Sequence, residues 1–371
     1  MNSVVYGQSK IRLFTKLIFT ILIILFLASC KSEPKQLVSF KNDKIEYMGR
    51  IGETDSHKEI YWSGSSIKLK FKGTSIKAIL EDEHGENYFN FIVDGKTISI
   101  VQLDSTKEIY DIASNLSNSI HTIEIFKRTE WTKGKTKFYG FQLNKNSKII
   151  DFKEKVRSIE FYGNSITAGY AVEDYSGKDS PEGVNTNNYN SYANMTALHF
   201  DANYNCIVRS GIGITVSWFP MIMDELYYRL DPSDENSLWD FSKYEPNIVV
   251  INLFQNDSWI VNMPENDQFK NRFENDAPTK EFMINSYKNF VQTIRSKYAN
   301  SKIICLLGNM DITKEGSLWP SYVEEAVSEL DDENIYALFI QYKNSEGHPK
   351  VEEQKILADG LIQFIEENIV W

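Results

Sequence analysis

The spacing of apolar residues changes once along the chain, near residue 150. Between about residues 40 and 146, short runs alternate apolar and polar side chains, and turn residues separate them. The run 88–93, for example, leads through Asp94-Gly95, a strong hairpin signal, into a second run at 97–101. Short strands at this spacing, without a helical period, predict an all-β sandwich over residues 40–150.

Residues 151–371 instead alternate apolar strand-like runs with helical segments. The runs lie at 159–161, 206–208, 248–253, 303–307 and 335–340. This alternation predicts a parallel sheet with helices on both faces, a three-layer α/β fold. Ligands of such sheets bind at the carboxyl ends of the strands, so polar residues that directly follow each run are candidates for a functional site.

Gly163-Asn164-Ser165 ends the first of these runs. An apolar run that stops at Gly-Asn-Ser and continues into small residues is typical of a strand that turns tightly into a helix. The Ser165 hydroxyl would then lie beside the free N–H groups of that helix, which can stabilise an anion. Ser165 is therefore a candidate nucleophile, although a serine here can also simply cap the helix.

Three further residues follow the carboxyl ends of later runs. Gly211 lets a backbone N–H approach a ligand without a Cβ in the way. The Asn256 amide can donate to a developing oxyanion, and His348, on the loop before the last helix, can act as the base for a serine. Each alone has a structural alternative, such as a turn or an Asx-turn. Together, four such residues at one edge of the sheet indicate a catalytic site.

The first 29 residues are typical of a targeting segment. Basic residues precede an apolar run that is short for a transmembrane helix. Leu27-Ala28-Ser29-Cys30 then looks like a bacterial lipobox, with an uncleaved anchor as the alternative. We expect Cys30 to be the lipidated first residue of the mature protein, followed by a polar tether over residues 30–39. Lys31 supplies no aspartate retention signal, which favours the outer membrane, on its periplasmic or its surface face.

Charge and cysteine content narrow the function further. The formal net charge is −11, and removal of a leader with three basic residues makes it −14. An acidic chain without a basic run is a poor candidate for binding nucleic acid. Cys206 and Cys305 lie in strand-like runs that a 2-1-3-4-5 strand order would hold ~14 Å apart, too far for a disulfide. No CxxC or HExxH spacing indicates a metal site.

Gly163-Asn164-Ser165 resembles the GDS block of the SGNH (GDSL-like) hydrolases, which have a flavodoxin-like sheet. Gly211, Asn256 and His348 resemble their glycine, asparagine and histidine blocks. A narrower resemblance is to carbohydrate esterase family two, whose members carry a jelly-roll domain before the SGNH domain. The stretches that carry it are 71–75 and 93–95 in the β domain and 192–193, 210–213, 239–241, 246 and 252–253 in the catalytic domain.

The resemblance implies a role for each matching residue. Ser165 is implied as the nucleophile, with its N–H as an oxyanion donor beside the Gly211 N–H and the Asn256 side chain. His348 is implied as the general base and then the general acid toward the leaving sugar hydroxyl. The implied reaction passes through an acyl-enzyme on acetylated polysaccharide or oligosaccharide, of the acetylxylan or glucomannan type. No metal or organic cofactor is implied.

The sequence departs from the family pattern at three positions. Asn164 replaces the usual aspartate of the first block, where the role is mainly structural. Phe254 replaces a glycine of the third block and could narrow the site. Ser345 stands where an aspartate commonly orients the histidine. Some members of the esterase family resemble a Ser–His dyad with a backbone carbonyl in that role, and we expect this arrangement here, because Glu346 has the wrong spacing.

Three functions fit these observations. The leading interpretation is a surface-anchored carbohydrate O-acetyl esterase. The alternatives are a carbohydrate-binding lipoprotein with a decayed site, which the missing aspartate favours, and an esterase of the same fold that acts on lipid or thioester acyl chains. The segment after Asn256 is polar and acidic, with isolated tryptophans that suit sugar faces. We expect Trp259, on a loop leaving the sheet edge, either to stack on a sugar ring or to pack the loop down.

Overall fold

The computed structural model describes residues 35–274 and 276–371. The leader, the candidate lipidation site Cys30 and the first residues of the tether lie outside this range. The end of the expected tether is not a tether: Lys35–Ser39 form strand β1, which pairs antiparallel with β11 (Thr136–Asn144). Across the residues that the model describes, no helix has the length and apolar character needed to span a membrane.

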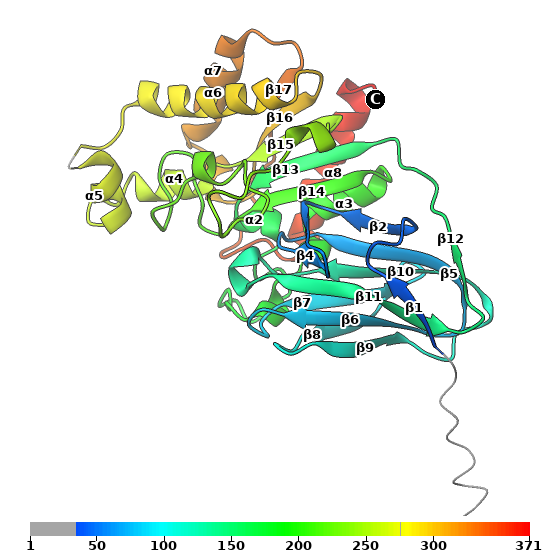
Figure 1. The fold of residues 1–371 in the computed structure, drawn as a ribbon. Helices are drawn as coiled ribbons and strands as arrows, with labels where there is room; N and C mark the ends of the chain where they lie inside the picture. Colours follow the sequence, from blue (N-terminus) through cyan, green and yellow to red (C-terminus); the bar gives the residue numbers. More distant parts are fainter. Residues whose placement is uncertain (1–34, 275) are drawn as a thin grey trace, which may run out of the picture.

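The first domain is a β-sandwich of two six-stranded sheets (Figure 1). One sheet has five strands in the order β3-β4-β11-β6-β9, and β1 pairs with β11 as the sixth. The bounds are β3 (Ile51–Glu53), β4 (Lys58–Ile60), β6 (Ile76–Asp82) and β9 (Glu108–Ala113). The other contains β12 (Lys148–Ile150), β5 (Ser66–Gly73), β10 (Ser119–Lys127), β7 (Tyr88–Val93), β8 (Lys96–Gln102) and β2 (Ile45–Met48).

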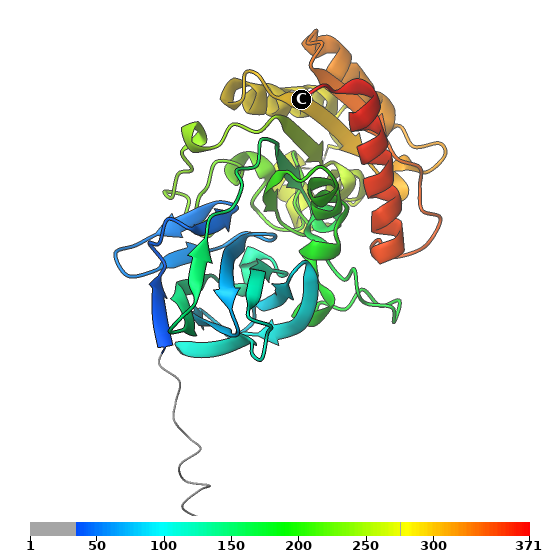
Figure 2. The same ribbon diagram turned by 90° about the vertical axis from the view of Figure 1, so that its right-hand side faces the viewer.

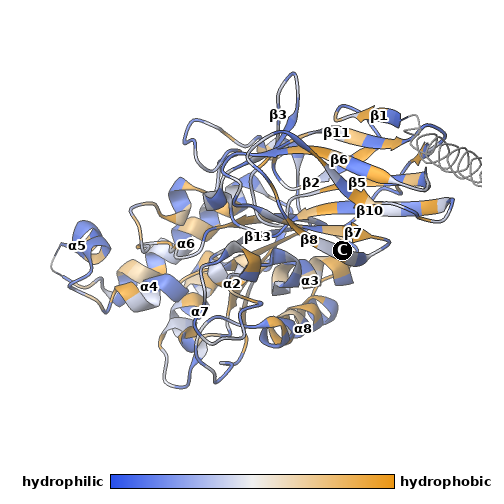
Figure 3. Cartoon of the chain, turned by 90° about the horizontal axis from the view of Figure 1, so that it is seen from below, coloured by the Kyte–Doolittle hydropathy of each residue, from blue (hydrophilic) through white to orange (hydrophobic). Residues whose placement is uncertain are grey.

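Alternating side chains give this sandwich its core. On β5, Ile67, Leu69 and Phe71 are fully buried, whereas Lys68, Lys70 and Lys72 between them are not. Figure 3 shows the corresponding change of hydrophobic and hydrophilic colour along β5, β6, β10 and β11. A period of two residues places every second side chain on the same face of a strand. The expected sandwich is therefore present.

The second domain contains a five-stranded parallel sheet in the order β14-β13-β15-β16-β17. Its strands are β13 (Ser158–Gly163), β14 (Asn203–Val208), β15 (Ile248–Asn252), β16 (Lys302–Leu307) and β17 (Ile335–Phe339). In chain order this is 2-1-3-4-5, the order that was assumed in judging the distance between the two cysteines. Cys206 on β14 and Cys305 on β16 are free and buried, as expected.

Helices cover both faces of this sheet (Figure 2). The helices are α2 (Ser165–Ala168), α3 (Tyr192–His199), α4 (Gln255–Ile260), α5 (Asp267–Phe273), α6 (Lys280–Lys297), α7 (Trp319–Leu330) and α8 (Val351–Asn368). Helices α6 and α7 share one apolar core with the sheet, and α3 and α8 share the other. Short 3-10 turns lie at η1 (Trp131–Lys133), η2 (Gly183–Asn185), η3 (Asn188–Asn190), η4 (Met223–Glu225), η5 (Phe241–Lys243) and η6 (Asp311–Thr313). The domain has the predicted three layers.

Arg50 joins the two domains. It lies between β2 and β3 of the sandwich, is 1% exposed, and donates to the backbone carbonyls of Tyr227 and Arg229 at 2.6 and 3.0 Å. Its second terminal nitrogen, Nη2, donates to Glu160 and Tyr162 on β13, at 3.3 and 3.2 Å. A buried guanidinium with several acceptors needs all of them in place, so it fixes how the sandwich sits against the sheet.

Candidate active site

Ser165 lies where β13 turns into α2. The strand ends at Gly163, and Asn164 caps the helix by accepting a hydrogen bond from the Ile166 N–H at 3.0 Å. Gly169, at a φ of 72°, ends the helix after one turn. Ser165 is therefore held by its own backbone at the carboxyl edge of the sheet, and Asn164 has the structural role that the sequence suggested.

His348 reaches Ser165 from the loop that precedes α8. Its Nε2 lies 2.8 Å from the Ser165 Oγ, although the two residues are 183 positions apart. The Tyr170 ring packs edge-on against the imidazole, with 4.9 Å between the ring centroids. The hydrogen bond that we expected between Ser165 and His348 is present, in the geometry that a nucleophile and its base require.

Asp179, and no backbone carbonyl, accepts from the other nitrogen of His348. The Asp179 Oδ2 lies 2.7 Å from His348 Nδ1 and also accepts the backbone N–H of His348 at 2.8 Å. The expected orientation by a backbone carbonyl is therefore wrong. Ser345 donates to Glu353 instead of orienting the ring. Gly347, at a φ of 70°, permits this arrangement, because a Cβ there would lie 2.9 Å from the Asp179 carboxylate.

The Asp179 carboxylate is held in its ionised form. Its hydrogen bond with His348, and then the Lys350 ammonium 2.8 Å from its second oxygen, keep the pKa of Asp179 well below its usual range despite partial burial. An ionised acceptor at Nδ1 fixes the tautomer that leaves Nε2 to accept from Ser165. Sequence reasoning missed Asp179 because the loop between α2 and α3 carries no motif spacing that relates it to Ser165 or His348.

Gly211 and Asn256 lie close to each other, because both contact Trp218. Gly211 has a φ of 84°, which favours glycine, and the side chains of Trp218 and Phe219 fill the space where a Cβ would lie. Asn256 donates one side-chain N–H to the Ile212 carbonyl at 2.8 Å and accepts the Trp218 indole N–H at 3.1 Å. The second N–H of Asn256 is the candidate oxyanion donor.

Asp257 ties these two segments together. It is fully buried and accepts hydrogen bonds from the backbone N–H groups of Ile214, Thr215 and Val216, at 2.7 to 3.2 Å. Burial raises the pKa of Asp257. Because it follows Asn256 directly, this carboxylate fixes the loop after β14 relative to the start of α4.

Two expectations about the third block need correction. Phe254 keeps a positive φ of 77°, but its ring is fully buried against Tyr287 and Trp319, so it does not narrow the site. Trp259 lies on helix α4 and not on a loop. Its indole N–H donates to the Asp311 carboxylate at 2.7 Å, and its ring lines an open cavity of about 540 Å³.

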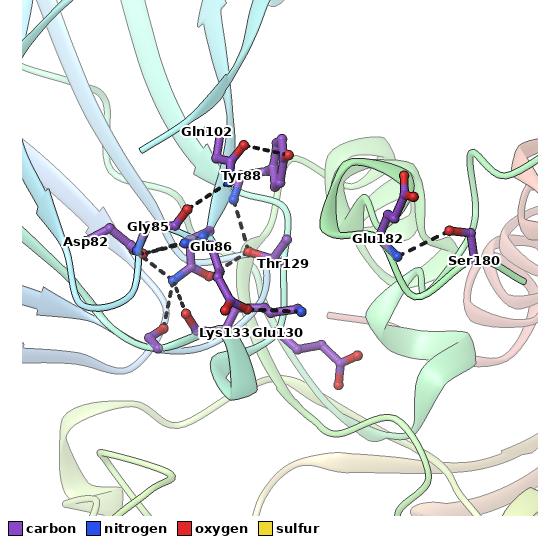
Figure 4. A network of polar contacts seen from close by, with 12 residues as sticks. Asp82, Gly85, Glu86, Tyr88, Gln102, Thr129, Glu130, Lys133, Ser180 and Glu182 are labelled. Atoms are coloured by element: carbon purple, nitrogen blue, oxygen red, sulfur yellow. Dashed lines mark hydrogen bonds and ion pairs between the residues drawn. The ribbon is translucent and has the colours of Figure 1, made fainter. Parts of the chain in front are cut away.

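A second cavity, of about 250 Å³, lies where the sandwich meets the α/β domain. Sandwich residues on its wall include Thr129, Glu130 and Lys133, and Tyr170 and Ser210 approach it from beside His348 and Gly211. Figure 4 shows Thr129, Glu130 and Lys133 on the sandwich side, with Ser180 and Glu182 on the facing loop. Within residues 35–274 and 276–371, no group of three or more His, Cys, Asp or Glu side chains is arranged to hold a metal.

Comparison with known proteins identifies the family to which both domains are similar. A family model for the carbohydrate esterase 2 N-terminal domain matches residues 47–152. The cellulase/esterase CelE of Acetivibrio thermocellus is 32% identical over 92% of this chain, which spans 41% of that relative's length. An acetylxylan esterase / glucomannan deacetylase of Cellvibrio japonicus is 26% identical over 83% of this chain and 85% of its own.

A solved structure shows the same two-domain arrangement. It is a family two carbohydrate esterase from Clostridium thermocellum in complex with cellohexaose, with a TM-score of 0.76 and 32% identity over 87% of this chain and 98% of that one. With this agreement across nearly the whole of a solved member, and with the family's N-terminal model matched by the sandwich, the chain belongs to carbohydrate esterase family two.

Proposed function

We propose that this chain is a carbohydrate O-acetyl esterase that works through a Ser165–His348–Asp179 triad. The observation that carries the proposal is the 2.8 Å contact between Ser165 Oγ and His348 Nε2 at the carboxyl edge of the sheet. An ionised carboxylate on the far side of the imidazole stabilises the imidazolium that forms when His348 takes the serine proton. The named relatives, all esterases, support the reaction class.

In the first half of the reaction, the Ser165 oxygen attacks the acetyl carbonyl carbon while His348 Nε2 takes the hydroxyl proton. Negative charge develops on the carbonyl oxygen, where the N–H groups of Ser165 and Gly211 and the Asn256 amide can donate to it. Collapse of this intermediate breaks the bond to the sugar oxygen, which receives the proton from His348. The sugar leaves with a free hydroxyl, and the acetyl group remains on Ser165.

Water then completes the cycle. His348 takes a proton from a water molecule as that water attacks the acetyl-enzyme, and the same three donors stabilise the second oxyanion. Proton return from His348 to Ser165 releases acetate and the free serine. Because every step uses groups on this chain and water, the proposed reaction requires no cofactor.

Acetylated polysaccharide or its oligosaccharides are the substrates that the site favours. The cavity at the domain boundary has a polar wall that includes Glu130, Lys133 and Arg209. Trp218, 43% exposed beside Gly211, and Trp259 on α4 offer indole faces of the kind that stack on sugar rings. Relatives named as acetylxylan esterase and glucomannan deacetylase support the same substrate class. A long acyl chain would need a continuous apolar trench instead.

A non-catalytic carbohydrate-binding role has less support. Its main argument was the missing carboxylate at position 345, and Asp179 now supplies a carboxylate to His348 from another loop. Lipid attachment at Cys30, with the protein held at the outer membrane, remains our proposal for the location. Its support is the lipobox sequence alone.

Acetate release tests the activity directly. The wild-type chain and Ser165→Ala should be compared on acetylated xylan, acetylated glucomannan and nitrophenyl acetate. We expect acetate from the wild type, and a decrease in kcat on the order of 10³ or more in the variant, with unchanged folding by circular dichroism. Equal acetate release by both proteins would exclude Ser165 as the nucleophile. Labelling with radioactive palmitate would test Cys30, with Cys30→Ser as the control.

A further inference from the structure

Four consecutive residues of the sandwich, Lys127 to Glu130, lie at the end of β10, and Arg128 and Glu130 among them contact the other domain. All four are buried, with exposures between 0% and 7%, although three of them have ionisable side chains. Figure 4 shows Thr129 and Glu130 in this position. Charged side chains are rarely buried without partners. The hydrogen-bond partners of this segment therefore show which parts of the structure it holds in place.

Glu130 holds the peptide next to the oxyanion glycine. One carboxylate oxygen accepts the backbone N–H of Ser210 at 2.6 Å, and the other accepts the Ser210 hydroxyl. Two bonds from one rigid carboxylate to one residue set both the position and the tilt of that residue. Ser210 is joined directly to Gly211, whose N–H is a candidate oxyanion donor, so the carboxylate determines where that donor points.

Arg128 holds the loop that carries Asp179. Its guanidinium donates to the Glu173 carboxylate, to the Val184 carbonyl at 2.7 Å and to the Thr186 carbonyl at 3.3 Å. These acceptors bracket Asp179 on both sides in the sequence. The loop between α2 and α3 is therefore fixed by a sandwich residue at two places, and Asp179 projects from between them to His348.

Lys127 sets the backbone conformation of the segment, which lets Arg128 and Glu130 reach the other domain. Its Nζ donates to the carbonyls of Thr129 and Glu130, at 3.0 and 3.2 Å, and to the Asn87 side chain. Both carbonyls therefore approach one nitrogen, which holds the chain in a bend just after the strand. The side chains of Arg128 and Glu130 can then extend across the domain boundary.

We propose that the 127–130 segment makes the β-sandwich a positioning part of the catalytic centre, with Glu130 aligning the Gly211 oxyanion donor and Arg128 aligning Asp179. Neither residue needs to touch the substrate for this. The inference rests on the proposed esterase function. It gives the sandwich a role in the chemical step itself, in addition to any role in holding polysaccharide.

Kinetics on two esters test the Glu130 part. We expect Glu130→Ala to lower kcat at least tenfold on both acetylated xylan and nitrophenyl acetate, with little change in KM, because a misplaced donor loses part of the ~10² to 10³ that an oxyanion donor contributes. Glu130→Gln keeps an oxygen for the Ser210 N–H and should recover most of kcat. Asp231→Asn, which alters another carboxylate that crosses the domain boundary to Lys135, is the matched control and should leave kcat unchanged.

Each other outcome would overturn this part of the inference. A loss on acetylated xylan alone would make Glu130 a substrate contact, and a Gln variant as poor as the Ala variant would show that alignment is not the cause. If Glu130→Ala does not fold, Ser210→Ala removes one of the two bonds without touching the sandwich, and an unchanged kcat there would also overturn it. A wild type without esterase activity would instead refute the proposed function.

A double-mutant cycle tests the Arg128 part. If Arg128 acts through Asp179, Arg128→Gln should lower kcat severalfold or more in the wild type but have little further effect in an Asp179→Asn background. Glu173→Gln, which weakens the ion pair with Arg128 from the loop side, should likewise lower kcat in the wild type and have little further effect in the Asp179→Asn background. Fully additive losses in both cycles would mean that Arg128 supports only the fold and would overturn this assignment.

Discussion

The Asp179 carboxylate lies 2.7 Å from the Nδ1 of His348, although 169 positions of the chain separate the two residues. Neither residue belongs to the element that carries Ser165: His348 reaches Ser165 from the loop before α8, and Asp179 reaches His348 from the loop between α2 and α3. Asp179 is also shared with Lys350, which binds its second oxygen at 2.8 Å. The carboxylate is thus ionised, immobilised and aimed at the nitrogen that must stay protonated while His348 acts as a base.

Neutralising Asp179 should disable the catalytic unit without unfolding it. Asp179→Asn keeps the size of the side chain but presents an amide that favours the wrong imidazole tautomer, so we expect kcat to fall on the order of 10³ or more. Initial rates on nitrophenyl acetate measure this effect. Glu346→Gln, one position beyond the usual aspartate site, is the control and should change kcat by less than about tenfold. A mild effect of Asp179→Asn would restore the dyad interpretation.

Removing Arg50 should destabilise the fold strongly. Arg50→Met leaves the buried Glu160 carboxylate without its cation and three other acceptors without their donor. We expect the free energy of unfolding to drop by about 3–5 kcal/mol, measured by urea denaturation. Adding Glu160→Gln should recover part of the loss, because it removes the unpaired charge. If the stability loss of the double variant equals the sum of the losses of Arg50→Met and Glu160→Gln alone, the two residues do not form a coupled pair.

Lys127 should make stability depend on pH above neutrality. Burial lowers the pKa of Lys127 to about 7, against the attraction of Asp82 and Glu130, while an unfolded lysine keeps its usual value of 10.5. Between these values the unfolded chain holds one more proton than the folded chain. The free energy of unfolding therefore increases with pH between 7 and 10.5, by up to about 1.4 kcal/mol per pH unit. The increase is complete above pH 10.5 and is lost as the pH falls to 7.

Denaturation of wild type and Lys127→Met at pH 7 and at pH 9 measures this dependence. The stability of the wild type relative to the variant should increase over that interval. Lys72→Met, at an exposed position on the neighbouring strand β5, should show no such trend. A difference between wild type and Lys127→Met that stays constant with pH would mean that Lys127 remains charged in the folded protein.

The two tryptophans near Asn256 are candidates for binding the sugar rings of the substrate. Trp218 is exposed beside Gly211 and also donates to Asn256, whereas Trp259 is half-buried and donates to Asp311. If the indole faces bind sugar, Trp218→Phe and Trp259→Ala should raise KM for oligosaccharide esters far more than for nitrophenyl acetate. Equal effects of Trp259→Ala on both substrates would mean that this ring only packs α4. Equal effects of Trp218→Phe would mean that Trp218 acts by holding the Asn256 side chain and not by binding sugar.

The sequence alone determined the parts of this protein that depend on local pattern. Alternation with a period of two predicted the sandwich, and the change to strands separated by helices predicted the parallel sheet. In such a sheet every strand ends at the same edge, so Ser165, Gly211, Asn256 and His348 could be placed together before any coordinates. The hydrogen bond between Ser165 and His348 agrees with that placement.

Only the tertiary structure decided which groups support those four residues. Asp179 and Glu130 act through contacts between segments far apart in the chain, and no spacing or period in the sequence records such contacts. Phe254 could be placed at the site edge, but whether its ring faced the site or the core depended on the packing of Tyr287 and Trp319. Local chemistry sets where strands and helices begin and end, whereas a loop takes its conformation from whatever the rest of the fold packs against it.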